Sequence, residues 1–338
     1  MSVLHLDLGA DSYDIVIERD SLRKAGEYLD LGHKVLVLTD DGVPAEYAKT
    51  VARQAKDGFG FTVPQGEDSK NIPQFSGILS EMLRRGFSRQ DAVVAVGGGV
   101  VGDLAGFAAA SFMRGVDFYN IPTTLLSEVD SSIGGKTAIN LGGVKNIVGA
   151  FHQPKKVLID PDVLKTLPPR QIANGLAEAI KMAATFDAEL FHFIETEDVM
   201  QNLDTIIASS LEIKKAVVEC DEKEAGLRRV LNFGHTIGHG IESYEELHGL
   251  YHGECIALGM IPMCEEEVRE RLIAVLKKVG LPTVLDFDAD RVYEAVTHDK
   301  KADGDQIRVI LVPEIGQYKM KKVSLYDFRQ TIKEAFAK

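Results

Sequence analysis

The sequence predicts two domains, an α/β domain with a parallel sheet and then a mostly α-helical domain. Strand-like and helix-like segments alternate in the first half, as in a parallel sheet covered by helices on both faces. After Pro161 long helical patterns replace this alternation. We therefore place an α/β domain at residues 1–158 and a mainly helical domain at 159–338, with the active site expected between the two halves.

The strands of the first half are short and apolar. Residues 34–39 (KVLVLT) are β-branched and aliphatic, which is typical of a strand buried on both faces. Residues 71–85 carry apolar side chains at three- and four-residue steps, which predicts an amphipathic helix. By the same criteria, further strands are predicted at 59–63, 91–96, 118–121 and 157–159, and further helices at 44–56 and 103–111.

The second half reads mainly as helices, opened by the Pro168-Pro169 pair. One late strand pair interrupts them, at 306–313 and 319–323. The predicted helices cover residues 171–185, 205–221, 231–244, 253–272 and 290–296.

Charge and composition exclude several classes of function. A net charge of -13 disfavours nucleic acid or an anionic membrane as a partner, because both need a positive face. No apolar run approaches the ~18 residues of a membrane span, and the first residues do not resemble a signal peptide. The three cysteines are odd in number and widely spaced, which indicates reduced thiols in a cytoplasmic protein.

Residues 97–102 form a Gly-x-Gly-x-x-Gly turn between the strand at 91–96 and a small-residue helix. Glycines allow close approach of a pyrophosphate, and the helix N-terminus supplies free N–H groups. The motif alone is weak, since a tight strand-to-helix turn also explains it. No acidic strand end follows ~20 residues later, and the acidic candidate, Asp40, lies upstream. A dinucleotide site here would therefore differ from an ordinary Rossmann fingerprint.

A possible metal site is divided among three segments. Glu178 lies mid-helix among apolar neighbours, His235 and His239 share a helix face because they are four residues apart, and His252 begins His-Gly-Glu. Two imidazoles and one carboxylate make a plausible catalytic metal site. A histidine pair at this spacing is more often structural, but the flanking glycines favour close approach of a ligand. His248 is a competing ligand without such glycines.

Lysines and arginines recur in glycine-rich loops and beside the candidate metal residues. A single lysine is usually a solvated side chain, whereas glycine-flanked lysines in loops are suited to phosphate. So many of them in an acidic protein indicate a small anionic ligand. The cations are Arg114, Lys136, Lys145, Lys181, Lys214, Arg228, Lys300 and Lys301.

Taken together, these segments resemble the 3-dehydroquinate synthase family, one of the sugar phosphate cyclases, which are related to glycerol and iron-dependent alcohol dehydrogenases. The resemblance covers nearly the whole chain with its motifs in one order. It implies the family's fold, an N-terminal α/β domain with an NAD site and a C-terminal helical domain, usually in a homodimer. The matching segments are 64–70, 97–103, 113–115, 122–124, 130–140, 145–146, 177–181, 226–228, 231–239, 252–254 and 299–301.

The resemblance also implies roles for individual residues. Zn²⁺ or Co²⁺ would be bound by Glu178, His235 and His252. The NAD contacts would be Asp40, Glu67, Lys70, Gly98, Gly99, Asp103, Thr123, Thr124 and Lys145, with Thr166 and Leu167 from the domain junction. The substrate phosphate would meet Arg114, Lys136, Asn146, His239 and a lysine of the 300–301 pair. Lys214 and Arg228 would bind the substrate carboxylate. Ring hydroxyls would be held by Asp130, Lys181 and Asn232.

The implied reaction converts 3-deoxy-D-arabino-heptulosonate 7-phosphate to 3-dehydroquinate and phosphate, a step of aromatic amino acid biosynthesis. NAD⁺ oxidises one secondary hydroxyl beside the metal, and the new ketone acidifies the neighbouring C–H. Phosphate then leaves by β-elimination, the same NADH returns the hydride, and the ring opens. An intramolecular aldol step closes the carbocycle, which proximity can favour by ~7–11 kcal/mol.

Two departures and three rivals qualify this interpretation. Asp41 beside Asp40 makes the ribose carboxylate ambiguous, and the 141–144 loop differs from the commoner family run. Sister cyclases share the fold and cofactors, but those using sedoheptulose phosphate lack the equivalent of His239, and the 2-deoxy-inosose enzymes differ at 128–135. A metal-dependent alcohol or glycerol dehydrogenase would release NADH and would not need the loop cations. A non-catalytic nucleotide-binding module would need neither those cations nor metal ligands.

Overall fold

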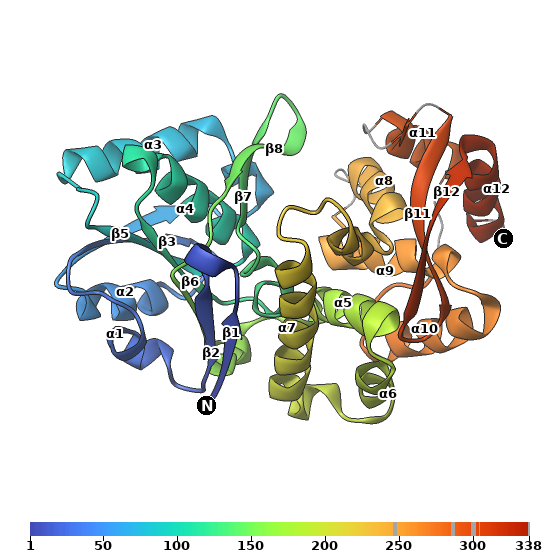
Figure 1. Cartoon of the computed structure of the whole chain (residues 1–338), viewed down its shortest axis with the longest axis horizontal. Helices are drawn as coiled ribbons and strands as arrows, with labels where there is room; N and C mark the ends of the chain where they lie inside the picture. The colour runs from blue at the N-terminus through green and yellow to red at the C-terminus, as the bar shows by residue number, and fades with distance from the viewer. Residues whose placement is uncertain (246–248, 285–287, 299–301, 304, 337–338) are drawn as a thin grey trace. The chain divides into compact units, whose positions relative to one another are not determined.

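The computed structural model describes the chain except residues 246–248, 285–287, 299–301, 304 and 337–338 (Figure 1). Two compact units are present, Met1–Pro168 and Pro169–Lys338. The sequence boundary at 158/159 lies just before a 3₁₀ helix, η6 (Pro161–Thr166), and the structure includes this helix in the first unit.

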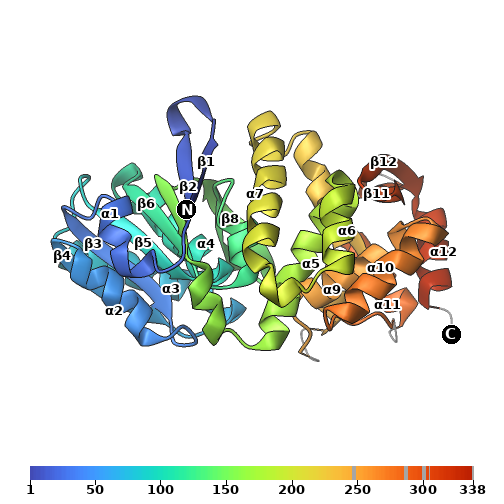
Figure 2. The ribbon, with the colours of Figure 1, turned by 90° about the horizontal axis from the view of Figure 1, so that it is seen from below.

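The first unit is built on a seven-stranded sheet of order β1-β2-β9-β6-β5-β3-β4. β1 pairs antiparallel with β2 and every other pairing is parallel, so the predicted parallel sheet is confirmed. The β1–β2 hairpin was not predicted, and Figure 2 shows it projecting beyond the other strands. The strands are β1 (Ser2–Leu6), β2 (Tyr13–Ile17), β3 (Lys34–Asp40), β4 (Asp57–Val63), β5 (Ala92–Gly97), β6 (Asp117–Pro122) and β9 (Lys156–Ile159).

Helices cover both faces of this sheet, as the alternation predicted (Figure 1). Leu36 and Leu38 of β3 pack with α3 (Ile72–Arg84) and α4 (Gly99–Ser111). Val35 and Val37 point the other way, toward α1 (Ala25–Tyr28) and α2 (Ala45–Gln54). Successive side chains of a strand face opposite layers, so a strand buried on both faces must be apolar throughout.

A second hairpin, β7 (Lys136–Leu141) and β8 (Val144–Phe151), follows a π-helical turn, η5 (Ser127–Ser131). It packs on α4, where a Cβ added to Gly106 would lie 2.4 Å from Thr137 Cγ2. Only glycine therefore allows this spacing. The sequence analysis did not predict these strands.

The second unit is mainly helical, as predicted, with one antiparallel sheet of order β10-β11-β12. None of the helices in the described part of the chain is long and apolar enough to cross a membrane. Its elements are α5 (Pro169–Phe186), α6 (Ala188–Thr196), α7 (Leu203–Cys220), η8 (Leu227–Asn232), α8 (His235–Glu245), α9 (His252–Met260), α10 (Glu266–Lys278), α11 (Ala289–His298), β10 (Ala302–Asp303), β11 (Gln306–Glu314), β12 (Gln317–Ser324) and α12 (Leu325–Phe336).

Two predicted helices were wrong in extent. The helix expected at 231–244 begins at His235, because the 3₁₀ helix η8 ends at Asn232 and Gly234 takes a φ of 77°. The single helix expected at 253–272 is two helices, α9 and α10, separated by a 3₁₀ turn that contains Pro262. Proline lacks the N–H that a continuing helix needs, so the break falls there.

Candidate functional site

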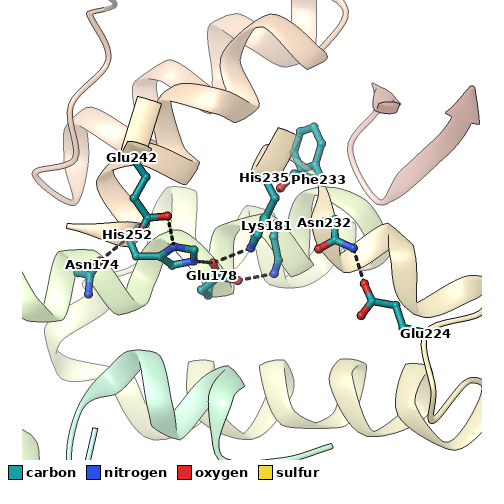
Figure 3. A network of polar contacts seen from close by, with 10 residues as sticks. Asn174, Glu178, Lys181, Glu224, Asn232, Phe233, His235, Glu242 and His252 are labelled. Carbon is teal, nitrogen blue, oxygen red and sulfur yellow. Dashed lines mark hydrogen bonds and ion pairs between the residues drawn. The ribbon is translucent and has the colours of Figure 1, made fainter. Parts of the chain in front are cut away.

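The centre of the candidate site is Glu178, a carboxylate carried by the buried helix α5 and 0% exposed (Figure 3). Its Oε2 accepts a hydrogen bond from Lys181 Nζ, one turn later on the same helix. Among the described residues its Oε1 has no hydrogen-bond partner, and it lies 3.7 Å from His235 Nε2 and 3.3 Å from His252 Nε2. An unsatisfied buried carboxylate oxygen is costly unless a cation meets it.

Both histidines present the same ring nitrogen to Glu178. His235 begins α8, and its Nδ1 lies 3.1 Å from the carbonyl oxygen of Phe233. His252 begins α9, and its Nδ1 lies 3.5 Å from Glu242 Oε2. One ligand atom from each of Glu178, His235 and His252 lies within 4.8 Å of the others. Two imidazoles and a carboxylate are a usual ligand set for catalytic zinc, so these residues fit a divalent metal.

The charges in this cluster favour a cation. Burial lowers the pKa of His235 well below its usual value. Burial also opposes the charge on His252, but Glu178 and Glu242 outweigh it and raise the pKa of His252 to about 10. Burial raises the pKa of Glu178, yet Lys181 and His252 together hold it low. Two carboxylates, Glu178 and Glu242, thus face His252, and a divalent metal would meet the same pair.

The glycines around the histidines have a different cause from the one expected. A Cβ on Gly238 would lie 2.8 Å from Ile256 Cδ1, and a Cβ on Gly259 would lie 2.1 Å from Gly234 O. These glycines let α8 and α9 approach each other closely. This close packing brings His235 and His252, which begin the two helices, near each other.

Helix α5 also fixes the start of α9. Arg170 donates from Nε and Nη2 to the two carboxylate oxygens of Glu254, both at 2.7 Å. Asn174 Oδ1 accepts the N–H of Gly253 at 2.6 Å. Arg170, Asn174 and Glu178 are four residues apart, so one helix face both supplies a ligand and holds the segment that carries His252. Arg170 and Asn174 were not predicted as site residues, although their four-residue spacing from Glu178 can be read from the sequence.

A second polar group lies around η8, which contacts both α5 and α7. Lys214 and Arg228, the predicted carboxylate partners, are buried, with 5% and 3% exposure. Asn232 Nδ2 donates to Glu224 Oε1 at 2.6 Å. Asp221 accepts the backbone N–H of Arg228 at 3.0 Å and so shapes the turn. Glu224 was not among the predicted site residues.

His239, another predicted residue of this unit, lies beside His235 and His252. Its ring centroid is 5.2 Å from that of His235 and 6.0 Å from that of His252. His248, the competing ligand, and Lys300 and Lys301 lie outside the described residues.

In the first unit, the predicted nucleotide residues gather at the carboxyl ends of the strands. From β3 the chain passes first to β4 on one side and then to β5 on the other, so the strand order reverses here. Ligands of open α/β sheets bind outside the strand ends at such a point. Asp40 ends β3 and accepts N–H groups of Gly42 and Val43 at 2.9 and 3.1 Å, while burial raises its pKa. Asp41 instead accepts the N–H of Gln65.

The glycines of the turn after β5 pack closely against neighbouring side chains. A Cβ on Gly98 would lie 3.0 Å from Thr124 Cγ2, and a Cβ on Gly99 would lie 3.0 Å from Ser131 Oγ. Thr123 N donates to Gly97 O, which joins the ends of β5 and β6. The helix α4 begins directly here, so its N–H groups and positive dipole end are available to a pyrophosphate.

A buried lysine connects residues that the resemblance had assigned to different ligands. Lys70 Nζ donates to Asp103 Oδ2 at 2.8 Å and to Asn146 Oδ1, and it lies 3.4 Å from Glu67 Oε1. Asn140 Nδ2 donates to the same Glu67 oxygen. Burial lowers the pKa of Lys70, but Asp103 and Glu67 outweigh this and raise it. Asn140 was part of a family motif but was not predicted as a site residue.

The other predicted residues of the first unit are spread over short segments. Thr166 ends η6, where its Oγ1 donates to Val163 O, and Leu167 follows directly. The rest are Arg114 in a 3₁₀ turn, Asp130 in η5, Lys136 at the start of β7 and Lys145 in β8.

Comparison with known proteins gives one family. The model of the 3-dehydroquinate synthase N-terminal domain matches residues 60–174, and that of the C-terminal domain matches residues 175–302. A 3-dehydroquinate synthase of Clostridium acetobutylicum is 41% identical over 345 residues, which cover 96% of this chain and 97% of the relative.

Two solved structures are also similar over nearly the whole chain. One is 2-deoxy-scyllo-inosose synthase complexed with carbaglucose-6-phosphate, NAD⁺ and Co²⁺, with a TM-score of 0.89, 27% identity, and coverage of 98% of this chain and 100% of that chain. The other is 2-epi-5-epi-valiolone synthase from Streptomyces hygroscopicus with NAD⁺ and Zn²⁺, with a TM-score of 0.85, 26% identity, and coverage of 96% and 95%.

Proposed function

The chain belongs to the 3-dehydroquinate synthase family, and we propose that it converts 3-deoxy-D-arabino-heptulosonate 7-phosphate to 3-dehydroquinate and phosphate in the shikimate pathway. One observation carries the proposal, the convergence of Glu178 Oε1 with Nε2 of His235 and of His252. The solved relatives hold NAD⁺ with Co²⁺ or Zn²⁺. We assign NAD and one divalent metal of this kind to this chain.

NAD and the metal would supply a reversible hydride acceptor and a Lewis acid at one secondary hydroxyl of the substrate. Glu178, His235 and His252 are the metal ligands. Lys181 Nζ holds Glu178 Oε2 and keeps this carboxylate ionised, so that Oε1 remains a charged ligand. Lys181 is therefore placed to hold a substrate oxygen beside the metal.

The substrate carries a carboxylate, hydroxyls and a phosphate, and we assign each to described residues. Lys214 and Arg228, both buried, are assigned to the carboxylate, because cationic side chains donate strong charge-assisted hydrogen bonds to a carboxylate. Asn232 Nδ2 donates to Glu224, and we assign the Oδ1 of Asn232 to a substrate hydroxyl. Asp130 is assigned to a hydroxyl as well. The phosphate is assigned to Arg114, Lys136, Asn146 and His239.

The nucleotide is assigned to the switch point between β3 and β5. Asp40 takes the ribose hydroxyls, and Gly98 and Gly99 allow the pyrophosphate to reach the N-terminus of α4. Lys70, which is 4% exposed, and its partner Asp103 are assigned to the same nucleotide. The remaining nucleotide contacts are Glu67, Thr123, Thr124, Lys145, Thr166 and Leu167.

We further infer a cytoplasmic homodimer. All three cysteines are free thiols, which suits a reducing compartment. The β7–β8 hairpin exposes the large apolar side chains of Leu141, Val144, Ile147 and Phe151. Exposed apolar patches mark protein interfaces, and light scattering of the purified chain measures whether a dimer forms.

The experiment that tests the function is a phosphate-release assay with the heptulosonate phosphate, catalytic NAD and Zn²⁺ or Co²⁺. The product is identified by mass and by conversion with a dehydratase. Phosphate and dehydroquinate in equal amounts, with no net NADH, are expected. Turnover of sedoheptulose phosphate alone would indicate a sister cyclase, and accumulating NADH would indicate a dehydrogenase.

The phosphate assignment is tested in the same assay. K136A should weaken binding of the sugar phosphate more than binding of NAD, whereas K49A, which removes an exposed lysine of α2, should change neither. Equal loss of both affinities in K136A contradicts the phosphate role.

A further inference from the structure

Glu242 is a carboxylate beside the candidate metal centre to which neither the sequence nor the family comparison gives a role. It lies on α8, one turn after His239 and two turns after His235, so all three share one helix face. Figure 3 shows its side chain directed at the His252 ring. The Oε2 to Nδ1 distance is 3.5 Å, and the carboxylate side chain is 21% exposed.

The two ring nitrogens of His252 face two different carboxylates. Nε2 lies 3.3 Å from Glu178 Oε1, on the side where the ligand atoms converge, and Nδ1 faces Glu242. A metal-bound histidine usually donates its other N–H to a carboxylate or carbonyl, which fixes the tautomer, the ring orientation and the ligand basicity. His252 has this arrangement.

His235 shows the same arrangement with a different acceptor. Its Nδ1 lies 3.1 Å from Phe233 O, a carbonyl only two residues earlier in the chain. His252 is instead the first residue of α9, and the acceptor that faces its Nδ1 comes from the other helix. The Nδ1 acceptor of His235 is thus a carbonyl of its own segment. The Nδ1 acceptor of His252 is Glu242, a side chain of the neighbouring helix α8.

We propose that Glu242 is a positioning residue that accepts the Nδ1–H of His252 and so directs the Nε2 lone pair toward Glu178 and the metal. This inference rests on the proposed metal site. The charge on Glu242 also strengthens His252 as a donor, because a carboxylate facing Nδ1–H raises the electron density on Nε2.

A competing role for Glu242 is that of a ligand. Ligand atoms of His239, Glu242 and His252 lie within 4.8 Å of one another, so these residues could hold a second ion. His252 would then have to bind one ion through each ring nitrogen, which requires loss of both ring protons. A neutral imidazole with one metal and one hydrogen bond needs no such loss, and the geometry therefore favours positioning.

The test compares E242A and E242Q with the parent protein and with E270A, which removes one exposed carboxylate from α10. The metal-free proteins are titrated with Co²⁺ against a chelator, and the cobalt absorption spectrum is recorded. We expect E242A to bind one Co²⁺ about 10–100-fold more weakly, as other outer-shell changes do. Its cobalt spectrum should shift, and E270A should bind Co²⁺ as the parent does.

E242Q should recover most of the affinity, because its amide oxygen still accepts the Nδ1–H without the charge. Co²⁺ affinity of E242A within twofold of the parent overturns the inference. The inference is also overturned if the parent binds two Co²⁺ ions and E242A binds only one, with the affinity of the tighter site unchanged. Glu242 would then be a ligand of the second ion. If the parent protein binds no Co²⁺, the proposed metal site fails, and the role of Glu242 fails with it. If the parent and E242A bind Co²⁺ equally well, the positioning role of Glu242 is refuted and the proposed metal site stands.

Discussion

The contact between α8 and α9 allows a sharp test of how the metal ligands are brought together. Gly259 of α9 lies against the backbone that leads into His235. A Cβ built there would be 2.1 Å from Gly234 O, about 1.3 Å short of ordinary contact at 3.4 Å. G259A must therefore push α9, which begins with His252, away from the start of α8.

The magnitude follows from two opposing terms. Forcing an extra carbon into a packed interior costs ~1–3 kcal/mol, and a clash with backbone belongs at the upper end. Replacing a helical glycine by alanine returns ~1 kcal/mol of helix propensity. A net loss of about 2 kcal/mol corresponds to a melting temperature ~4–8 °C lower for a unit of this size. Metal distances tolerate only ~0.2 Å, so metal affinity should fall more steeply than stability.

The assay pairs calorimetry of the metal-free protein with Co²⁺ titration. G77A is the matched control, since Gly77 also lies within a helix, α3, but its added Cβ would meet nothing closer than Phe61 Cζ at 3.7 Å. G77A should be unchanged or more stable by ~0.4–1 kcal/mol and should bind Co²⁺ normally. If G259A binds Co²⁺ as tightly as G77A does, the helix contact does not set the ligand spacing and the reasoning is refuted.

Three further predictions concern single side chains. H235A removes one of three ligands and should abolish both bound zinc, measured by elemental analysis, and turnover; zinc retained at one equivalent contradicts the assignment. K70M leaves Asp103 without its ammonium in a largely buried network and should cost ~3 kcal/mol in urea unfolding while weakening NAD binding; an unchanged midpoint would disprove the network's role. Burial raises the pKa of Asp40, so its carboxyl stabilises the fold at low pH and this contribution is lost as pH rises through the folded value. D40N should thus unfold at higher urea than the parent at pH 7 but not at pH 3, and it should bind NAD more weakly; a gap that widens as pH falls would contradict the sign.

Local patterns predicted most of the central sheet, because burial on both faces leaves a readable signal. The strand expected at 34–39 is present as Lys34–Asp40, and the helix expected at 71–85 is present as Ile72–Arg84. The β7–β8 hairpin was not predicted. β8 runs from Val144 to Phe151 with apolar side chains exposed to solvent, so neither alternation nor continuous burial identifies it.

In the second unit, the ends of two helices are set by a proline and a glycine, which hydrophobic periodicity does not take into account. Apolar residues continue at helical spacing through Pro262, and the pattern therefore extended one helix over what are two. Similarly, 231–234 carries apolar residues that belong to a 3₁₀ helix and a left-handed glycine turn. In both cases one backbone property, the absent N–H of proline or the positive φ of glycine, overrides side-chain pattern.

The candidate metal ligands could be proposed from residue type, but the contacts that orient them could not. Glu178, His235 and His252 carry metal-binding groups, so chemistry alone makes them candidates. Arg170 and Glu242 are ordinary charged residues whose function comes from what they meet, Glu254 in one case and His252 Nδ1 in the other. Each of those contacts crosses between helices, and helix periodicity describes only one helix at a time.

The glycines near the histidines also owe their role to contacts between helices, which the sequence pattern does not reveal. Their clustering around the histidines was interpreted as room for a ligand, and the structure shows close helix packing at these glycines. Gly253 has Asn174 O at 2.1 Å from an added Cβ, and Gly259 has Gly234 O at the same distance. α9 is therefore held against α5 at one end and against α8 at the other by backbone contacts that no larger residue allows. Side chains as short as histidine and glutamate can share one ion only if their helices approach this closely, so the glycines and the ligands depend on each other.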